Sequence, residues 1–270
     1  MALKATTSFT TSLKEWREYR KFSQLDLALE ADVSQKHVSY LETGRSNPTP
    51  EMIVRLAEAL DIPLRERNLL LLSAGYRAGY QETDLTDPSM TFVNEALTRM
   101  LKHHDPFPAL VVDRYWTIKK TNSAADALIA LLPDVQALAP SADSMNLAFM
   151  TVHPQGLRQY ITNWEQAFPL FIQRLKREAA ATGDPKLMTA IAELLTLSGS
   201  AETLSFINED LMPVIPLEMD INGLKLSLFT VIATFGTAQD ITTDELRIES
   251  FYPANAETEA FFTNLSLKGI

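Results

Sequence analysis

Residues 23–44 read SQLDLALEADVSQKHVSYLETG, and this stretch decides the fold of the first part of the chain. Ser23 and Ser34 each precede a run of apolar residues at helical spacing, and a serine there accepts a backbone N–H of the first turn. Gly44 follows the second run, as a glycine that adopts a positive φ often does. The stretch therefore predicts two short helices joined by a tight turn at residues 31–33.

The apolar positions define one face of each helix, which we expect to be buried: Leu25, Ala28 and Leu29 in the first, Val38 and Leu41 in the second. The opposite face of the second helix carries hydrogen-bonding groups, namely Gln35, Lys36, Ser39 and Tyr40. Such a face suits the DNA major groove, where the base edges present donors and acceptors. A serine-capped helix pair alone is equally typical of a simple helical hairpin.

Residues 33–76, VSQKHVSYLETGRSNPTPEMIVRLAEALDIPLRERNLLLLSAGY, resemble the helix-turn-helix domain of the phage-repressor-like (Cro/C1, xenobiotic-response-element) regulators, and most closely their MmyB-like branch. The likeness rests on Gln24, Ser34, Gln35, Leu41, Glu42, Gly44 and Arg45. It implies a five-helix domain whose partner is double-stranded DNA. The DNA-binding residues that follow from this resemblance are Gln24, Ser34, Gln35, Lys36, Ser39, Tyr40, Thr43 and Arg45.

The charge of the chain is unevenly distributed. The 270 residues carry a net charge of −10. Residues 1–81 hold 11 basic and 10 acidic side chains, a net charge of +1, whereas residues 82–270 hold 13 and 24, a net charge of −11. Phosphate would repel the acidic second part, so non-specific DNA affinity should be modest. Binding should then depend on base contacts and on pairing into a homodimer.

Several classes of protein are excluded or disfavoured by composition. The chain has no cysteine, which excludes disulfides, thiolate metal sites and cysteine catalysis. No apolar run approaches the ~20 residues that span a bilayer, and the first residues, MALKATTSFTTS, lack the apolar core of a signal peptide. We therefore expect a cytoplasmic protein without a membrane partner.

Helix start and stop residues in the rest of the first part predict three more helices. One covers residues 11–21, with Arg17 and Arg20 expected on its solvated side. Thr49 caps another, with Pro50 at its first position, and the last runs from Pro63 to Gly75. The polar segment 81–88 then marks a boundary. We expect a DNA-binding domain at 9–80, a linker and connecting helix at 81–104, and a second domain at 105–270.

The second domain mixes strand and helix patterns. Residues 109–113 and 116–121 read as a hairpin, Asn122 caps a helix, and this order resembles the opening of a PAS domain. Residues 133–143 read as a loop, a long helix is expected from Gly156 with a kink at Pro169, and another covers 186–197. Asn222-Gly223 between two apolar runs is a strong hairpin signal. With a strand at 246–252 and a helix at 256–265, the sequence predicts an α+β, PAS-like domain with an antiparallel sheet and a helical cover.

This second part also resembles the MmyB-like regulators. The matching pieces are Pro108-Ala109-Leu110, Asn122, HPQGLR at 153–158, NWE at 163–165, TFGTAQDITTDELRIE at 234–249, and Phe251 with Pro253. The resemblance implies a PAS-like ligand-binding domain, with a fatty acid as the suggested ligand. It alone supplies that ligand class.

A lipid site needs apolar walls and a polar anchor. Arg114 and Arg158 are candidate carboxylate partners because guanidinium forms a bidentate fork. Asn122 is a weaker polar candidate, since it also fits a structural role as a helix cap. The apolar candidates are Trp116, Phe149, Met150, Tyr160, Trp164, Phe168, Phe229, Val231 and Phe235, each of which is also a reasonable core residue.

Signs of catalysis or metal binding are weak. His103, His104 and Asp105 adjoin one another, but adjacent ligands point in different directions and no third ligand is evident. No glycine-rich phosphate loop or nucleophile elbow is present. We therefore expect no enzyme, no metal and no cofactor beyond a bound fatty acid. The predicted function is a sequence-specific transcription regulator that senses a small apolar ligand; the alternative is a DNA-binding regulator whose second domain binds a protein partner.

Overall fold

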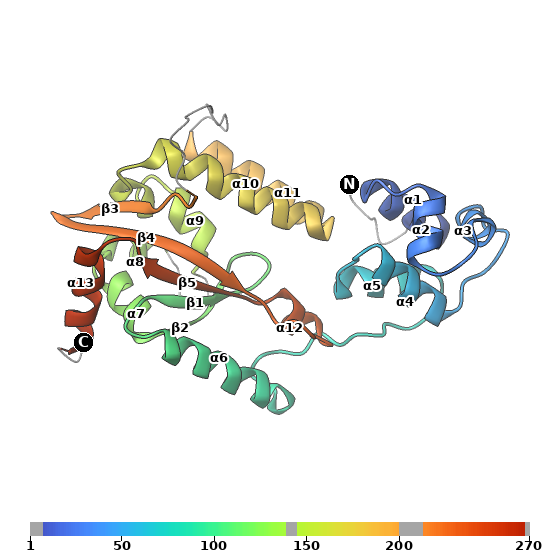
Figure 1. The fold of residues 1–270 in the computed structure, drawn as a ribbon, viewed down its shortest axis with the longest axis horizontal. Helices are drawn as coiled ribbons and strands as arrows, with labels where there is room; N and C mark the ends of the chain where they lie inside the picture. The colour runs from blue at the N-terminus through green and yellow to red at the C-terminus, as the bar shows by residue number, and fades with distance from the viewer. Residues whose placement is uncertain (1–7, 139–144, 200–212, 268–270) are drawn as a thin grey trace. The chain divides into compact units, whose positions relative to one another are not determined.

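The structure is a computed structural model that describes residues 8–138, 145–199 and 213–267 (Figure 1). The chain divides into two compact units. The first contains the chain up to Thr83 together with Glu178–Pro185 and Thr237–Asp244, and the second contains the remainder. The domain limits 9–80, 81–104 and 105–270 stay a prediction. That prediction did not anticipate that Glu178–Pro185 and Thr237–Asp244 would group with the first unit.

Five helices build the first unit: α1 (Phe9–Tyr19), α2 (Gln24–Glu30), α3 (Gln35–Glu42), α4 (Pro50–Ala59) and α5 (Leu64–Ser73). Ser8, Ser23, Ser34 and Thr49 each accept a backbone N–H with a side-chain oxygen. These caps satisfy donors that a helix leaves unpaired at its start. The predicted five-helix domain is confirmed, with α1 beginning two residues earlier than expected.

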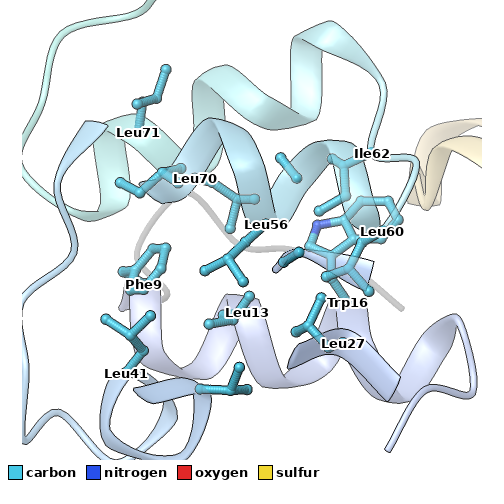
Figure 2. Packing of buried hydrophobic residues seen from close by; sticks show 14 of the residues in the cluster. Phe9, Leu13, Trp16, Leu27, Leu41, Leu56, Leu60, Ile62, Leu70 and Leu71 are labelled. Atoms are coloured by element: carbon cyan, nitrogen blue, oxygen red, sulfur yellow. The ribbon is translucent and has the colours of Figure 1, made fainter. Parts of the chain in front are cut away.

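The core of this unit is made by apolar side chains from all five helices (Figure 2). Leu13 and Trp16 of α1 lie against residues of the other helices, and none of the labelled side chains exposes more than 5% of its surface. Burying one such leucine or aromatic side chain is worth ~1.5–3 kcal/mol. The labelled set is Phe9, Leu13, Trp16, Leu27, Leu41, Leu56, Leu60, Ile62, Leu70 and Leu71.

The buried face of α2 differs from the prediction. Leu25 and Leu29 are 49% and 72% exposed, whereas Leu27, Ala28 and Ala31 are buried. Both sets contain separations of three and four residues, as a helical stripe does, because three leucines alternate within α2. Spacing alone could not choose between them. Packing against α3 and α4 selects the second set.

The second unit is built on one antiparallel sheet with the strand order β2-β1-β5-β4-β3. Its strands are β1 (Ala109–Val112), β2 (Ile118–Thr121), β3 (Leu217–Ile221), β4 (Leu224–Ala233) and β5 (Arg247–Pro253). Asn222 and Gly223 connect β3 to β4, both with positive φ (54° and 91°). Two consecutive positive φ angles are the signature of the tight hairpin turn that Asn-Gly favours.

Helices cover this sheet. They are α6 (Thr91–His104) after the 3-10 turn η1 (Pro88–Met90), α7 (Ser123–Ala130), α8 (Pro133–Ala137), α9 (Leu147–Val152), η3 (Leu157–Tyr160), α10 (Trp164–Thr182), α11 (Pro185–Ser198) and α13 (Ala256–Leu267). The short helix α12 (Ile241–Glu245) lies almost entirely in the segment Thr237–Asp244, which groups with the first unit. Figure 1 shows α6 on one side of the sheet and α10 on the other. Buried Leu97 and Leu101 of α6 pack on Val111 and Ile248. The predicted α+β domain is confirmed.

Two predicted elements of this unit are wrong. Residues 133–137 form the short helix α8 rather than a loop, with Pro133 at the first position, where its missing N–H is harmless. The rest of that predicted loop, 139–143, lies outside the described residues. The long helix begins at Trp164 instead of Gly156, because residues Leu157–Tyr160 form the separate turn η3 and the turn residues Thr162 and Asn163 hydrogen-bond the backbone of Glu218 and Pro216. Pro169 lies inside α10.

Candidate functional site

Helix α3 presents the face that the sequence predicted. Ser34 accepts the N–H of His37 at 3.1 Å and caps the helix, so one of the predicted DNA-binding residues has a structural role as well. Val38 and Leu41 are fully buried and fix the orientation of α3 in its unit. Gln35 and Lys36 at the start of the helix are consequently exposed.

Tyr40 forms the centre of a basic cluster on this face. The Lys36 Nζ lies 5.5 Å from its ring centroid and the Arg45 Cζ lies 5.8 Å from it. A cation over an aromatic face is attracted by the negative charge of the π system. The ring therefore holds two positive charges near each other, one from α3 and one from the loop that follows. Thr43, a predicted DNA-binding residue at the C-cap of α3, donates its hydroxyl to the Ser39 carbonyl at 2.8 Å.

Gln24, another of the predicted DNA-binding residues, is hydrogen-bonded to the end of α3. Its Nε2 donates to Oε2 of Glu42 at 2.8 Å, and Arg17 donates Nε and Nη2 to the same carboxylate at 2.6 and 3.0 Å. The Arg17 Nη1 donates to the Phe22 carbonyl at 2.8 Å. The hydrogen bond to Glu42 raises the pKa of Arg17 above its ordinary value, against the effect of burial.

Arg17 is therefore a residue whose role the sequence prediction missed. It is 8% exposed rather than solvated, and the Glu42 side chain is 3% exposed. One signal was available, because Arg17 lies four residues after the buried Leu13 and so on the same face of α1. The pairing with Glu42, 25 residues away, had no local signal.

The second unit contains a cavity of about 390 Å³ between α10 and the sheet. That volume is within the usual range of small-molecule sites, ~300–1,000 Å³. Most of its lining is apolar, and the residues of α10 recur every three or four positions, as one stripe of a helix does. The lining residues are Leu147, Thr151, Leu157, Ile161, Trp164, Ala167, Phe168, Leu170, Phe171, Arg174, Arg177, Val214, Ile215, Leu217, Leu228, Phe229, Thr230, Glu249 and Phe251.

Charged side chains gather at one part of this lining. Arg174 Nη1 lies 3.0 Å from Oε1 of Glu249, and the Glu249 side chain is 4% exposed. Arg177 follows Arg174 by three residues on the same stripe and is exposed. Burying a carboxylate beside apolar groups costs free energy unless a partner compensates it, and Arg174 supplies that compensation.

A second, smaller cavity of about 60 Å³ adjoins the first. All of its lining side chains are apolar, and five residues line both cavities: Leu147, Leu157, Leu217, Leu228 and Phe251. Half of the other lining residues come from α7, α8 and α9. They are Pro108, Leu110, Ile118, Ala125, Leu128, Ile129, Leu132, Val135, Met150 and Met219.

Some of the predicted ligand-binding residues line these cavities. Trp164 and Phe168 are buried in the main cavity wall, with their rings stacked at 4.7 Å. Met150 lines the second cavity. Phe229 borders the main cavity, but its ring stacks on Tyr252 at 5.5 Å. Since neighbouring residues of a strand point to opposite faces, this ring is turned away from the face that Leu228 presents.

The structure places both predicted arginine anchors outside the described lining of either cavity. Arg114 is buried and forms an ion pair with Glu245. Arg158 donates to the Ser198 carbonyl and lies over the Trp164 ring, with its Cζ 5.1 Å from the centroid. Sequence reasoning missed Arg174, Arg177 and Glu249. The first two continue the i+3 spacing from Phe171, which was the available signal.

Asn122 has a structural role. Its Oδ1 accepts the N–H groups of Ala109 and Ala125 at 2.9 and 3.0 Å, and its Nδ2 donates to the carbonyls of Leu101 and Phe107. This confirms the predicted cap of α7. The side chain is 5% exposed and does not line the cavities in the described residues.

The remaining predicted ligand residues lie elsewhere in the described part of the second unit. Trp116 is buried with a φ of 63° in the turn before β2, and Phe149 packs against His153. Burial raises the pKa of Tyr160, with a smaller contribution from Asp134. Val231 is 48% exposed, and Phe235 packs on the cluster under α6. Neither Val231 nor Phe235 belongs to the described lining of the two cavities.

Comparisons with known proteins identify the two domains. The sequence model of the MmyB-like transcription regulator ligand binding domain matches residues 93–265. The chain belongs to the MmyB-like transcription regulators. A helix-turn-helix model matches residues 13–67, so this MmyB-like regulator combines a DNA-binding domain with a ligand-binding domain. Both families are of the transcription regulator type, not enzymes.

Other comparisons add little. One solved structure, titled as that of an RNA-binding light-oxygen-voltage receptor, is similar over 98% of this chain and 65% of that chain, with 12% identity and a TM-score of 0.27. Similarity at that TM-score supports no conclusion about fold or function. No curated protein gives a significant match.

Within residues 8–138, 145–199 and 213–267, no three or more His, Asp or Glu side chains are grouped to hold a metal, and no helix is long and apolar enough to cross a membrane.

Proposed function

We propose that this MmyB-like regulator binds a palindromic DNA operator as a homodimer, and that a fatty acid in the α10 cavity controls that binding. Membership of the family supports DNA binding and the presence of a ligand. We propose in addition that the ligand is a fatty acid, that the operator is palindromic and that the regulator is a homodimer.

The exposed face of α3 supports the DNA part of the proposal. Gln35 and Lys36 project from the first turn, where a recognition helix contacts base edges. Tyr40 holds Lys36 and Arg45 close together, which suits a backbone of phosphates. One α3 reads a single half-site, so a two-fold dimer matches a palindrome.

The cavity along α10 is the single observation that carries the ligand part. It is mainly apolar and positively charged at one end. A fatty acyl chain gains ~0.8 kcal/mol per buried methylene, so about ten methylenes contribute ~8 kcal/mol before the costs of ordering and association. If roughly half of that gain is lost, the remaining ~4 kcal/mol corresponds to millimolar binding, so micromolar affinity requires a longer chain or a contribution from the carboxylate head group.

Control of DNA binding requires that the fatty acid prefers one of two states of the regulator. A ligand with equal affinity for both states would shift nothing. Coupling free energies between two sites are typically ~1–3 kcal/mol, which changes affinity roughly 5- to 150-fold. We therefore expect saturating fatty acid to change operator affinity within that range.

Mass spectrometry of an organic extract from the purified regulator tests for a bound fatty acid directly. Operator affinity is then measured by fluorescence anisotropy with delipidated protein and with added fatty acid. Ala167→Phe fills the cavity from α10 and should abolish both fatty-acid binding and its effect on DNA. Ala192→Phe introduces the same ring at an exposed position of α11 and should change neither.

The alternative function has a distinct outcome in the same experiment. If the extract holds no lipid and added fatty acids bind neither the parent nor the control variant, the cavity is not a lipid site. The second domain would then be assigned to a protein partner. If Ala167→Phe binds fatty acid as well as the parent, the site lies elsewhere.

A further inference from the structure

The cavity stripe of α10 changes character along its length. It begins with Trp164, Phe168 and Phe171 and ends with Arg174 and Arg177. Thirteen residue steps at the helical rise of 1.5 Å cover about 20 Å. The cavity therefore has an apolar end and a cationic end that are separated along one helix.

The charges at the cationic end leave one positive charge in excess. Glu249 neutralises Arg174 through the 3.0 Å ion pair. Arg177 adds a second guanidinium, and in the described part of the chain it makes no ion pair. This end is therefore matched to a ligand group with a single negative charge, and guanidinium favours a carboxylate by forming two parallel hydrogen bonds.

The apolar end continues into the second cavity. Phe251 and Glu249 lie two residues apart on the same face of β5, since side chains of a strand alternate. Glu249 borders the cationic end, whereas Phe251 lines both cavities, as do Leu157 and Leu228. A long apolar chain that extends from the main cavity into the second cavity would pass along these shared residues.

We propose that the ligand is a monoanionic, single-chain amphiphile in a fixed orientation, with its head group at Arg177 and its tail directed past Leu228 and Phe251 toward the second cavity. The inference rests on the proposed function of the main cavity and adds the head-group anchor, the orientation and a limit to chain length. Because Glu249 already neutralises Arg174, only the charge of Arg177 remains for the ligand, and a second negative charge on the ligand would be repelled by Glu249.

The head-group anchor is tested by comparing an acid with a neutral analogue. Dodecanoic acid and 1-dodecanol are titrated by calorimetry against the full-length parent, Arg177→Gln and the control Arg99→Gln, which alters an exposed arginine of α6. Arg177→Gln should weaken the acid about tenfold, the loss of one charge-assisted contact, and leave the alcohol unchanged. Equal losses for both probes, or no loss for the acid, would overturn the anchor.

The same titration separates this inference from the function on which it rests. If the parent binds neither probe, the lipid site itself fails. If the parent binds both probes and Arg177→Gln binds them as the parent does, the lipid site stands and only the orientation is wrong.

The direction of the tail is tested with unbranched carboxylic acids of increasing length. Each methylene that remains buried should raise affinity about fourfold. Leu128→Phe fills the second cavity, so the rise should stop at a shorter chain than in the parent while short acids bind unchanged. Ile129→Phe fills the same cavity from the next position and serves if the first variant fails to fold. An unchanged length profile in a folded variant would contradict the proposed tail position.

Discussion

The Nε2 of Gln24 lies 2.8 Å from Oε2 of Glu42, which ties the first residue of α2 to the last residue of α3. Glu42 is held in turn by two nitrogens of Arg17. Three helices thus meet at one buried carboxylate. The side chain of Gln24, a predicted DNA-binding residue, is therefore held in place by the same carboxylate that binds the end of α3.

Removal of this carboxylate should strongly destabilise the first unit. Glu42→Ala leaves Arg17 buried without its main partner, and breaking a buried ion pair in this way costs about 3–5 kcal/mol. Urea denaturation of the full chain, followed by the indole N–H NMR signal of Trp16, measures the change. Glu18→Ala is the matched control, because Glu18 lies 3.7 Å from the same guanidinium but is 56% exposed. That change should cost less than about 1 kcal/mol, and a similar cost for both variants would contradict the role of Glu42.

Gln35 should read base edges. Gln35→Ala should cost ~1–3 kcal/mol at the operator and relax specificity at one base pair, since a bidentate contact to a base would be lost. Fluorescence anisotropy with the operator and with random duplex DNA separates the two effects. If both duplexes lose affinity equally, Gln35 does not read a base.

Arg45 should contact the phosphate backbone. Arg45→Ala should weaken binding to all sequences, and the slope of log K against log salt should decrease in magnitude by ~1, because one fewer counterion is released. Lys225→Ala, which removes an exposed cation from β4, is the control and should leave the slope unchanged. A parent-like slope for Arg45→Ala would remove this residue from the interface.

Gly156 is required by the close approach of two backbone segments. A Cβ at this position would lie 2.0 Å from the Met150 carbonyl oxygen and 3.1 Å from that of His153, so Gly156→Ala must displace main chain. Overpacking of this kind costs ~1–3 kcal/mol or more. Gly236→Ala is the control, since its Cβ would meet nothing within 4 Å. Equal thermal stability of the two variants would show that residues 150–156 relax freely.

The cap of α2 should respond to acid. Asp26 accepts the backbone N–H of Ser23 at 2.8 Å, and this hydrogen bond, followed by one to the Ser23 hydroxyl, lowers the pKa of Asp26. The ionised form is therefore favoured by folding, so its contribution is complete above the unfolded pKa and is lost as the pH falls through the lower, folded value. NMR titration should give a pKa below the ordinary aspartate value. In Ser23→Ala, which lacks the hydroxyl, the pKa should rise toward that value; an unchanged pKa would argue against the hydroxyl contribution.

Local signals in the sequence were sufficient for most of the fold. Ser34, Thr49 and Asn122 marked helix starts because a short polar side chain at such a position satisfies orphan backbone donors. Asn222-Gly223 marked the β3–β4 hairpin because few residues tolerate two positive φ angles. Each of these signals acts within four residues, which is the range that a sequence pattern covers.

The misassigned parts depend on contacts between distant residues. The start of α10 is set by Asn163, whose side chain bonds Pro216 and Glu218 some 55 residues later. The cationic end of the cavity depends on the meeting of Arg174 with Glu249, 75 positions apart. Arg114 and Arg158 were equally plausible from sequence, because a guanidinium shows no local sign of whether protein or ligand will occupy it.

The pairing of Arg17 with Glu42 also restricts how this protein can evolve. Either charge alone would be left buried, so a chain that loses one of them passes through a destabilised intermediate before the second change can compensate. Relatives of this regulator should therefore keep both residues or replace both. Positions 17 and 42 are expected to covary in a lineage, whereas exposed Gln35 can change by single steps as the operator drifts.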